Sequence, residues 1–126
     1  MLNLNLFVST NGRIGRQTWW KSFIMLNAII FFLYLFMFLF GDPTIKNGED
    51  ISGILQTVSM IIFQLIIAVV LIVVSIKRLH DIDKSGWYYL LALVPFIGGP
   101  ILIIYLGFIK GTNGPNQYGE DPLLVD

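Results

Sequence analysis

The stretch ISGILQTVSMIIFQLIIAVVLIVVSI, residues 51–76, decides the fold of this chain, because it contains no charged side chain. It is longer than the run of about 20 apolar residues that an α-helix needs to cross a hydrocarbon core about 30 Å thick. Inside lipid a segment must satisfy its own backbone hydrogen bonds, which a single helix can do and a single strand cannot. Residues 51–76 are therefore predicted to form a transmembrane helix.

Two more uncharged segments flank this one, at residues 22–40 and 86–109. Both are long enough to cross a membrane. Hydrophobic residues make up 56% of the sequence and charged residues 13%, which is far from the usual composition of soluble domains. The sequence predicts an all-α integral membrane protein with three transmembrane helices in a single domain, residues 1–126.

The third segment, residues 86–109, is interrupted by VPFIGGP at residues 94–100. Its prolines lack an N–H donor and clash with the preceding turn, so the helix is predicted to be kinked here. A complete break would give a re-entrant hairpin with arms too short to cross singly. We expect a kinked full span, because re-entrant backbone must be shielded from lipid by protein. The polar tail, residues 110–126, is then expected outside, across the membrane from residues 77–85.

The distribution of Lys and Arg predicts the orientation, since these residues gather in cytoplasmic segments. Placing the N-terminus inside puts most of the eight Lys and Arg residues on the cytoplasmic side. The cytoplasmic set is Arg13, Arg16, Lys21, Lys77, Arg78 and Lys84, and the outer set is Lys46 and Lys110. The N-terminus is therefore predicted to be cytoplasmic, and we expect no removable signal peptide ahead of the first span.

The segment before the first span, residues 9–21, is predicted to be a short interfacial helix. Arg13, Arg16 and Trp20 are three and four residues apart, so they lie on one helical face. One interpretation is a membrane anchor, with indoles at headgroup level and cations among lipid phosphates. The alternative is that the arginines pair with acidic residues after the second span or bind a specific anionic headgroup.

Polar residues on one side of the second predicted helix suggest contacts with protein rather than lipid. Interhelical hydrogen bonds, within the bundle or to a second copy, are the favoured interpretation. A solute or ion track is the alternative, but no span contains the ionisable side chains that usually mark ion paths. The residues are Ser52, Gln56, Thr57, Ser59 and Gln64.

The charged stretch KRLHDIDKSGWYY, residues 77–89, contains the only histidine in the sequence. Catalysis requires a nucleophile, a base and an orienting group in one pocket, and His80 beside Asp81 is weak support for that. A metal site from His80, Asp81 and Asp83 is not expected, because these positions spread around a helix. We predict no catalytic residue, no metal and no cofactor. We expect the second helix to continue past Ile76 and to end at a C-terminal cap formed by Ser85 and Gly86.

The formal net charge of zero and the absence of cysteine exclude further classes of function. Short, scattered groups of cations cannot neutralise a run of phosphates, so nucleic acid is not an expected partner. Without cysteine the chain has no disulfide and no thiolate ligand.

Three motifs resemble the signatures of the family of small bacterial inner-membrane proteins typified by YhaH, a family of unknown function. They are GRIGRQTWW at 12–20, KRLHDIDKSGWYYLLALVPFIGG at 77–99 and GTNGPNQYGEDP at 111–122. Lys77 departs from the pattern, which has an arginine there. The resemblance implies a location in the bacterial cytoplasmic membrane and no established activity. The site residues that it implies are Arg13, Arg16, Trp20, Arg78, His80, Asp81, Ser85, Gly86, Asn116, Tyr118, Gly119 and Asp121.

The preferred hypothesis is a charge network in which Arg78 and Asp81 face Arg13 and Arg16 at the cytoplasmic surface. It would hold the N-terminal segment against the second helix and leave excess positive charge for anionic lipid or a partner. The function predicted first is a non-enzymatic interaction or scaffold protein, whose partner is lipid, a second copy of the chain or another membrane protein. A small oligomeric transporter or channel-like protein is the alternative, and a membrane-embedded enzyme ranks third.

Overall fold

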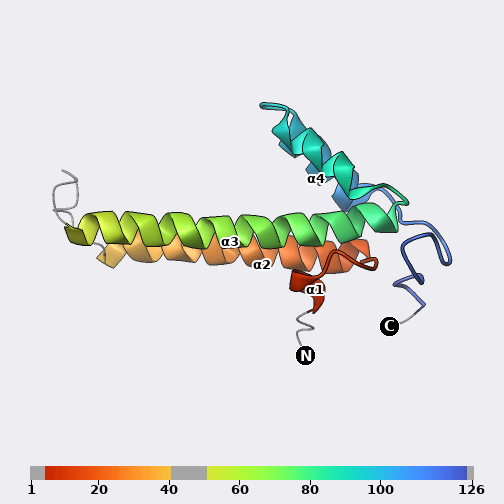
Figure 1. Ribbon diagram of the computed structural model, residues 1–126, viewed down its shortest axis with the longest axis horizontal. Coiled ribbons are helices and arrows are strands. Elements are labelled where there is room, and N and C mark those ends of the chain that lie inside the picture. Colours follow the sequence, from red (N-terminus) through yellow and green to blue (C-terminus); the bar gives the residue numbers. More distant parts are fainter. Residues whose placement is uncertain (1–4, 41–50, 125–126) are drawn as a thin grey trace.

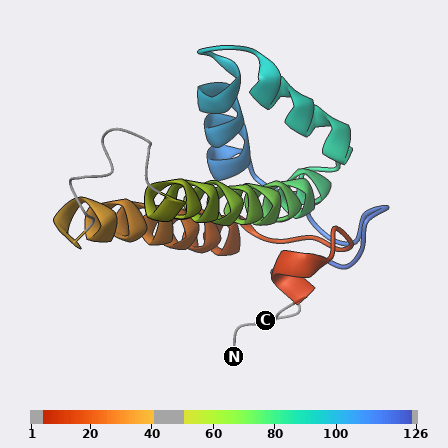
Figure 2. The same cartoon turned by 60° about the vertical axis from the view of Figure 1, so that its left-hand side comes forward.

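The computed structural model describes residues 5–40 and 51–124, and these ranges are mostly helical. Two long helices lie side by side, and a shorter helical hairpin leans away from one end of this pair (Figures 1 and 2). In chain order the helices are α1 (Asn5–Val8), α2 (Arg16–Phe40), α3 (Ile51–Asp81), the 3₁₀ helix η2 (Gly86–Leu93) and α4 (Gly98–Phe108).

Helices α2 and α3 contain the first two predicted spans, and both are long and apolar enough to cross a membrane. The predicted interfacial helix over 9–21 is wrong, because α2 already begins at Arg16 and the residues just before it are not helical. Gly12 has a φ of 89°, a conformation that interrupts a right-handed helix. The first turn of α2 closes where the Trp19 amide donates to the Gly15 carbonyl at 3.1 Å.

Helix α3 continues past Ile76, as expected, and ends at Asp81. The predicted cap is wrong: Asp83 has a φ of 58°, and the Lys84 amide donates to the Leu79 carbonyl at 2.9 Å, closing the end. Ser85 instead caps the start of η2, where its Oγ accepts from the Trp87 amide at 3.4 Å.

The third apolar segment is a hairpin, which corresponds to the re-entrant alternative and not to the kinked full span that was expected first. The break at 94–97 is complete, with Phe96 at a φ of 64° (Figure 2). Pro95 lies in this turn and Pro100 in the first turn of α4, and neither has an N–H donor with which to continue a helix. Gly98 allows the arms to meet, because a Cβ there would collide with the Leu91 carbonyl.

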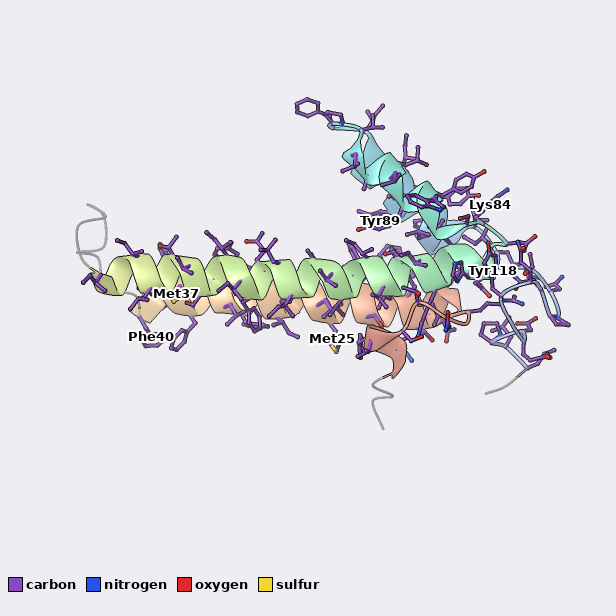
Figure 3. The ribbon with its side chains drawn as sticks, viewed as in Figure 1. Met25, Met37, Phe40, Lys84, Tyr89 and Tyr118 are labelled. Atoms are coloured by element: carbon purple, nitrogen blue, oxygen red, sulfur yellow. The ribbon has the colours of Figure 1, made fainter. Side chains whose placement is uncertain are left out.

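The reversal brings the tail back to the end of α3, where the Thr112 amide donates to the Asp81 carbonyl at 2.8 Å. The expectation that residues 110–126 lie across the membrane from residues 77–85 is therefore wrong for the described part of the tail. Figure 3 shows Lys84 and Tyr118 at this end of the molecule and Met37 and Phe40 toward the other.

The core of the described residues lies where α2 begins, α3 ends and α4 returns. Trp19 and Leu106 are almost fully buried there, and the short helix α1 packs against the same cluster through Leu6 and Phe7. Large apolar side chains along the rest of α2 and α3 are exposed, as expected of helices that face lipid. The buried hydrophobic members of the cluster are Ile14, Trp19, Val74, Leu79, Ile82 and Leu106.

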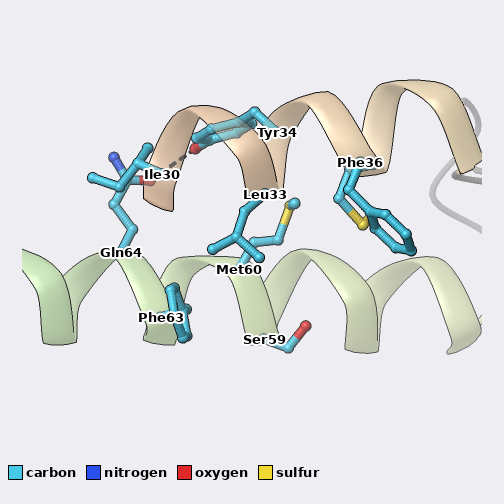
Figure 4. A pocket seen from close by; sticks show the side chains of 9 residues that line it. Ile30, Leu33, Tyr34, Phe36, Ser59, Met60, Phe63 and Gln64 are labelled. Atoms are coloured by element: carbon cyan, nitrogen blue, oxygen red, sulfur yellow. Dashed lines mark hydrogen bonds between the residues drawn. The ribbon is translucent and has the colours of Figure 1, made fainter. Parts of the chain in front are cut away.

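A groove of about 310 Å³ lies between α2 and α3, away from this core (Figure 4). The Tyr34 hydroxyl donates to Gln64 Oε1 at 2.9 Å in its wall. Gln56 reaches Met37 Sδ at 3.0 Å, so both glutamines contact α2 as expected. Thr57 and Ser59 instead donate to carbonyls of their own helix.

Candidate functional site at the polar end

The end where α2 begins, α3 ends and the tail returns is called the polar end here, and it comprises residues 12–16, 77–85 and 110–122. Arg13 lies at its centre, with its side chain 1% exposed. Its Nε and Nη2 atoms donate to Asp81 Oδ1 at 3.2 and 3.1 Å. Its other hydrogen bonds reach carbonyls of the tail: Thr112 at 2.7 Å, Gly114 at 2.7 Å and Gly119 at 3.2 Å.

These bonds match the five N–H donors of an arginine, so the Arg13 guanidinium is fully satisfied by protein groups. A lysine, with a compact ammonium group, cannot reproduce this planar set. Arg13 therefore holds the segment before α2, the end of α3 and the tail together.

Arg78 forms a second connection, between α3 and α4, and its side chain is fully buried. Its Nε donates to the Leu106 carbonyl at 2.8 Å, and its Nη2 donates to the Ile109 carbonyl. Carbonyl groups at the end of a helix lack partners within it, and a cation is favourable at that position. Arg78 thus stabilises the returning arm of the hairpin at the point where it reaches α3.

Asp81 joins these two arginines, because Arg78 Nη1 donates to its Oδ2 while Arg13 donates to its Oδ1. The two guanidinium groups share this carboxylate, which has little access to water because it is buried. A Cβ at Gly111 would collide with this carboxylate, which explains a glycine there.

The tail forms a compact turn against the end of α3. Asn116 Nδ2 donates to the His80 carbonyl and to Thr112 Oγ1, both at 2.9 Å. The backbones of Asn116 and Gly119 exchange hydrogen bonds at 3.0 and 3.1 Å. Gly119 has a φ of 137°, which only glycine adopts readily.

Asp121 closes the tail on itself. Its Oδ2 accepts from the Gly114 amide at 2.8 Å and its Oδ1 from the Leu123 amide at 3.0 Å. These amide bonds, from Leu123 first and then Gly114, lower the pKa of Asp121, because they favour the ionised carboxylate.

The ring of His80 stacks on the ring of Tyr118, with centroids 3.9 Å apart and planes 1° from parallel. His80 Nδ1 is buried without a hydrogen-bond partner among the described residues. Within residues 5–40 and 51–124, no group of three or more His, Cys, Asp or Glu side chains is placed to hold a metal ion.

Trp20 and Arg16 lie beside the Arg13 cluster and contact the last turn of α4. Trp20 Nε1 donates to the Gly107 carbonyl at 3.1 Å, and the exposed Arg16 donates to the Phe108 carbonyl at 3.3 Å. Arg16 does not join the expected charge network by a direct bond: in the described part of the chain, Asp81 pairs with Arg13 and Arg78.

The polar end gathers most of the site residues that the sequence predicted. Four are not part of this network: Arg16 and Trp20 bond to the last turn of α4, and Ser85 and Gly86 shape the start of η2. Sequence reasoning missed Thr112 and Gly114, which contribute backbone carbonyl groups. Every residue has a carbonyl group, so the residue type does not indicate this role. The glycine spacing in GTNGPNQYG was the available signal. The residues brought together are Arg13, Arg78, His80, Asp81, Asn116, Tyr118, Gly119 and Asp121.

Two membrane-length helices, a short apolar hairpin and an end closed by buried arginines define a small all-α membrane protein. The chain belongs to the family described as "Protein of unknown function (DUF805)", whose profile matches residues 7–120. This match confirms the predicted family.

Two relatives support the membrane class. Inner membrane protein YhaH of Escherichia coli (strain K12) is 36% identical over 121 residues, covering 96% of this chain and 93% of that protein. Inner membrane protein YhaI of the same organism is 32% identical over 119 residues, covering 94% of this chain and 90% of the relative. No solved structure matches the chain.

Proposed function

We propose that the protein is a non-enzymatic interaction protein of the bacterial inner membrane, with its polar end at the cytoplasmic surface. There it contacts anionic lipid headgroups or an acidic segment of a partner protein. The observation that carries this proposal is that some cations are buried and bonded within the protein, whereas others are exposed. Arg13 and Arg78 are used inside the protein, whereas Arg16, Lys21 and Lys110 are exposed.

The positions of the cations support the cytoplasmic orientation. Because the hairpin returns the tail, every Lys and Arg except Lys46 belongs to a segment at the polar end or to the first turns of α2. An excess of Lys and Arg on one side is the usual mark of the cytoplasmic side. Anionic lipid in that leaflet attracts each exposed cation by about 1 kcal/mol.

The internal bonding of the polar end supports a structural rather than a catalytic role for it. The Arg13 donors and both oxygens of Asp81 are occupied, and the His80 ring lies against Tyr118. The groove between α2 and α3 is lined by apolar and uncharged polar side chains, so it gives the transporter alternative no particular support.

Extraction of the native membrane into polymer discs, followed by mass spectrometry of lipids and proteins, tests the proposal. The discs are expected to be enriched in anionic lipid or in one reproducible membrane protein. The double variant Lys21→Gln/Lys84→Gln removes the exposed Lys21 and the half-buried Lys84, so it should reduce lipid enrichment by on the order of tenfold, which corresponds to between about 1 and 2 kcal/mol of attraction. Lys46→Gln is the matched control. Discs with bulk lipid composition and no partner would contradict the proposal.

A further inference from the structure

A second cavity, of about 160 Å³, lies at the polar end between the start of α2 and the tail. Its lining includes Arg16 and Thr18 from α2, Asp81 from the end of α3, and Lys110, Thr112 and Asp121 from the tail. It far exceeds the about 10–15 Å³ that one water molecule requires, so a polar group of several atoms fits.

We propose that this cavity is a phosphate-binding pocket, which takes the phosphate of an anionic lipid headgroup or a free phosphate. The proposal rests on the proposed function, because it assigns the contact with anionic lipid to one site. We call this cavity the phosphate pocket.

The charges around the phosphate pocket favour an anion. It contains the carboxylates of Asp81 and Asp121, but Asp81 is bonded to Arg13 and to Arg78. Arg16 and Lys110 add positive charge from separate segments. The lining alone holds two cations and two carboxylates. Arg13 and Arg78, bonded to Asp81 from outside the lining, raise the cations to four, and a bound anion reduces this excess.

Free donors are present at the pocket to receive such an anion. Among the described residues, Arg16 donates one hydrogen bond, to the Phe108 carbonyl, so most of its five N–H donors are available. Lys110 also lines the pocket and is exposed. A guanidinium fork together with an ammonium group matches the several oxygens of a phosphate better than the two oxygens of a carboxylate.

The position of the pocket in the molecule favours the phosphate of a lipid headgroup as its ligand. Arg16, which lines the pocket, bonds to the Phe108 carbonyl, and the rings of Phe108 and Trp20 meet edge to face with centroids 5.9 Å apart. Tryptophan side chains favour the headgroup level of a bilayer. The pocket is therefore expected near the level of lipid phosphates, since the exposed apolar side chains of α2 and α4 would lie in the acyl region.

Binding is tested with the full-length protein in a neutral detergent, in which excess detergent removes loosely attracted lipid. Native mass spectrometry counts phosphatidylglycerol or phosphatidylcholine that stays bound, and thermal unfolding is followed with inorganic phosphate or with sulfate. The native protein should retain one phosphatidylglycerol in preference to phosphatidylcholine. If inorganic phosphate raises the unfolding temperature, sulfate does not, and no phosphatidylglycerol is retained, the pocket is assigned to free phosphate.

The decisive variants are Lys110→Gln, which removes an exposed side chain and is expected to fold, and Arg16→Gln/Lys110→Gln. Each should weaken retention by on the order of tenfold or more. Lys21→Gln/Lys84→Gln removes equal charge outside the pocket and should keep the bound lipid. Equal losses in both double variants would overturn the pocket while leaving general attraction to anionic lipid intact. Absence of retention in the native protein, with bulk lipid in polymer discs, would overturn both proposals.

Discussion

At the scale of single residues, Asp81 is the group on which the polar end depends most. Its carboxylate accepts from Arg13 and Arg78, and its backbone carbonyl accepts from Thr112. Burial of two arginines costs free energy, and the shared carboxylate offsets that cost only because the hydrogen bonds of both guanidinium groups are also satisfied.

Asp81→Asn is expected to lower the free energy of unfolding by about 3–5 kcal/mol, because it leaves two buried cations without an opposite charge. Denaturation of the detergent-solubilised protein measures the effect. Asp83→Asn is the control, since Asp83 is exposed in the same turn and should change stability by less than about 1 kcal/mol. Equal losses in the two variants would contradict the role assigned to Asp81.

Asp121 predicts a dependence on pH. Its lowered pKa means that the ionised form stabilises the folded tail above the unfolded pKa of about 3.9. This stabilisation is lost as the pH falls through the lower folded value. The amide proton of Gly114 should change its NMR shift in that acidic range and not between pH 5 and 7. Asp121→Asn should abolish the change, and persistence of the titration in that variant would show another group to be responsible.

At the scale of helices, the two long ones were predictable and the hairpin was not. The thickness of a hydrocarbon core sets the length of uncharged sequence that a spanning helix needs. The lengths of residues 22–40 and 51–76 alone therefore predict two spanning helices. VPFIGGP permits either a kink or a reversal. Two contacts favour the reversal: Arg78 bonds to the carbonyls of Leu106 and Ile109, about 30 residues away in the sequence, and Gly98 fits against Leu91 across the turn.

The same limits apply to the candidate site. The pairing of Arg13 with Asp81 was expected from charge, but the carbonyls of Thr112, Gly114 and Gly119 complete the Arg13 shell through backbone atoms. The tail was expected on the other side, and only the re-entrant alternative placed it on the same side as Arg13.

The close contact between the hairpin arms predicts that alanine substitution at two adjacent glycines changes the free energy of unfolding differently. Gly98→Ala should destabilise by about 1–3 kcal/mol, because the added methyl collides with the Leu91 carbonyl. A Cβ at Gly99 meets nothing within 4 Å, so Gly99→Ala should be neutral or slightly stabilising. Thermal unfolding of the two variants in one detergent compares them. A stable Gly98→Ala variant would show that the arms do not meet as described.

At the scale of the whole molecule, the reversal of the third segment brings the tail back to the end of the long helix pair where α1 lies, so both ends of the described chain are expected on one side of the membrane. The absence of native cysteine allows single cysteines to be labelled cleanly. Thr10→Cys and Glu120→Cys, both at exposed positions, should be protected from a membrane-impermeant maleimide in intact cells and react after lysis. Asn47→Cys, between α2 and α3, should react in intact cells. Labelling of Glu120→Cys without lysis would contradict the shared side.

The lengths of the hairpin arms also give the protein an uneven cross-section. Eight residues of 3₁₀ helix at about 2.0 Å each, or eleven of α-helix at about 1.5 Å each, extend roughly 16 Å, about half of a 30 Å core. In a bilayer the polar-end leaflet therefore accommodates four helical segments and the opposite leaflet two. The protein is a wedge, and it fits best where the monolayer at its broad end is stretched, as on the convex side of a curved membrane.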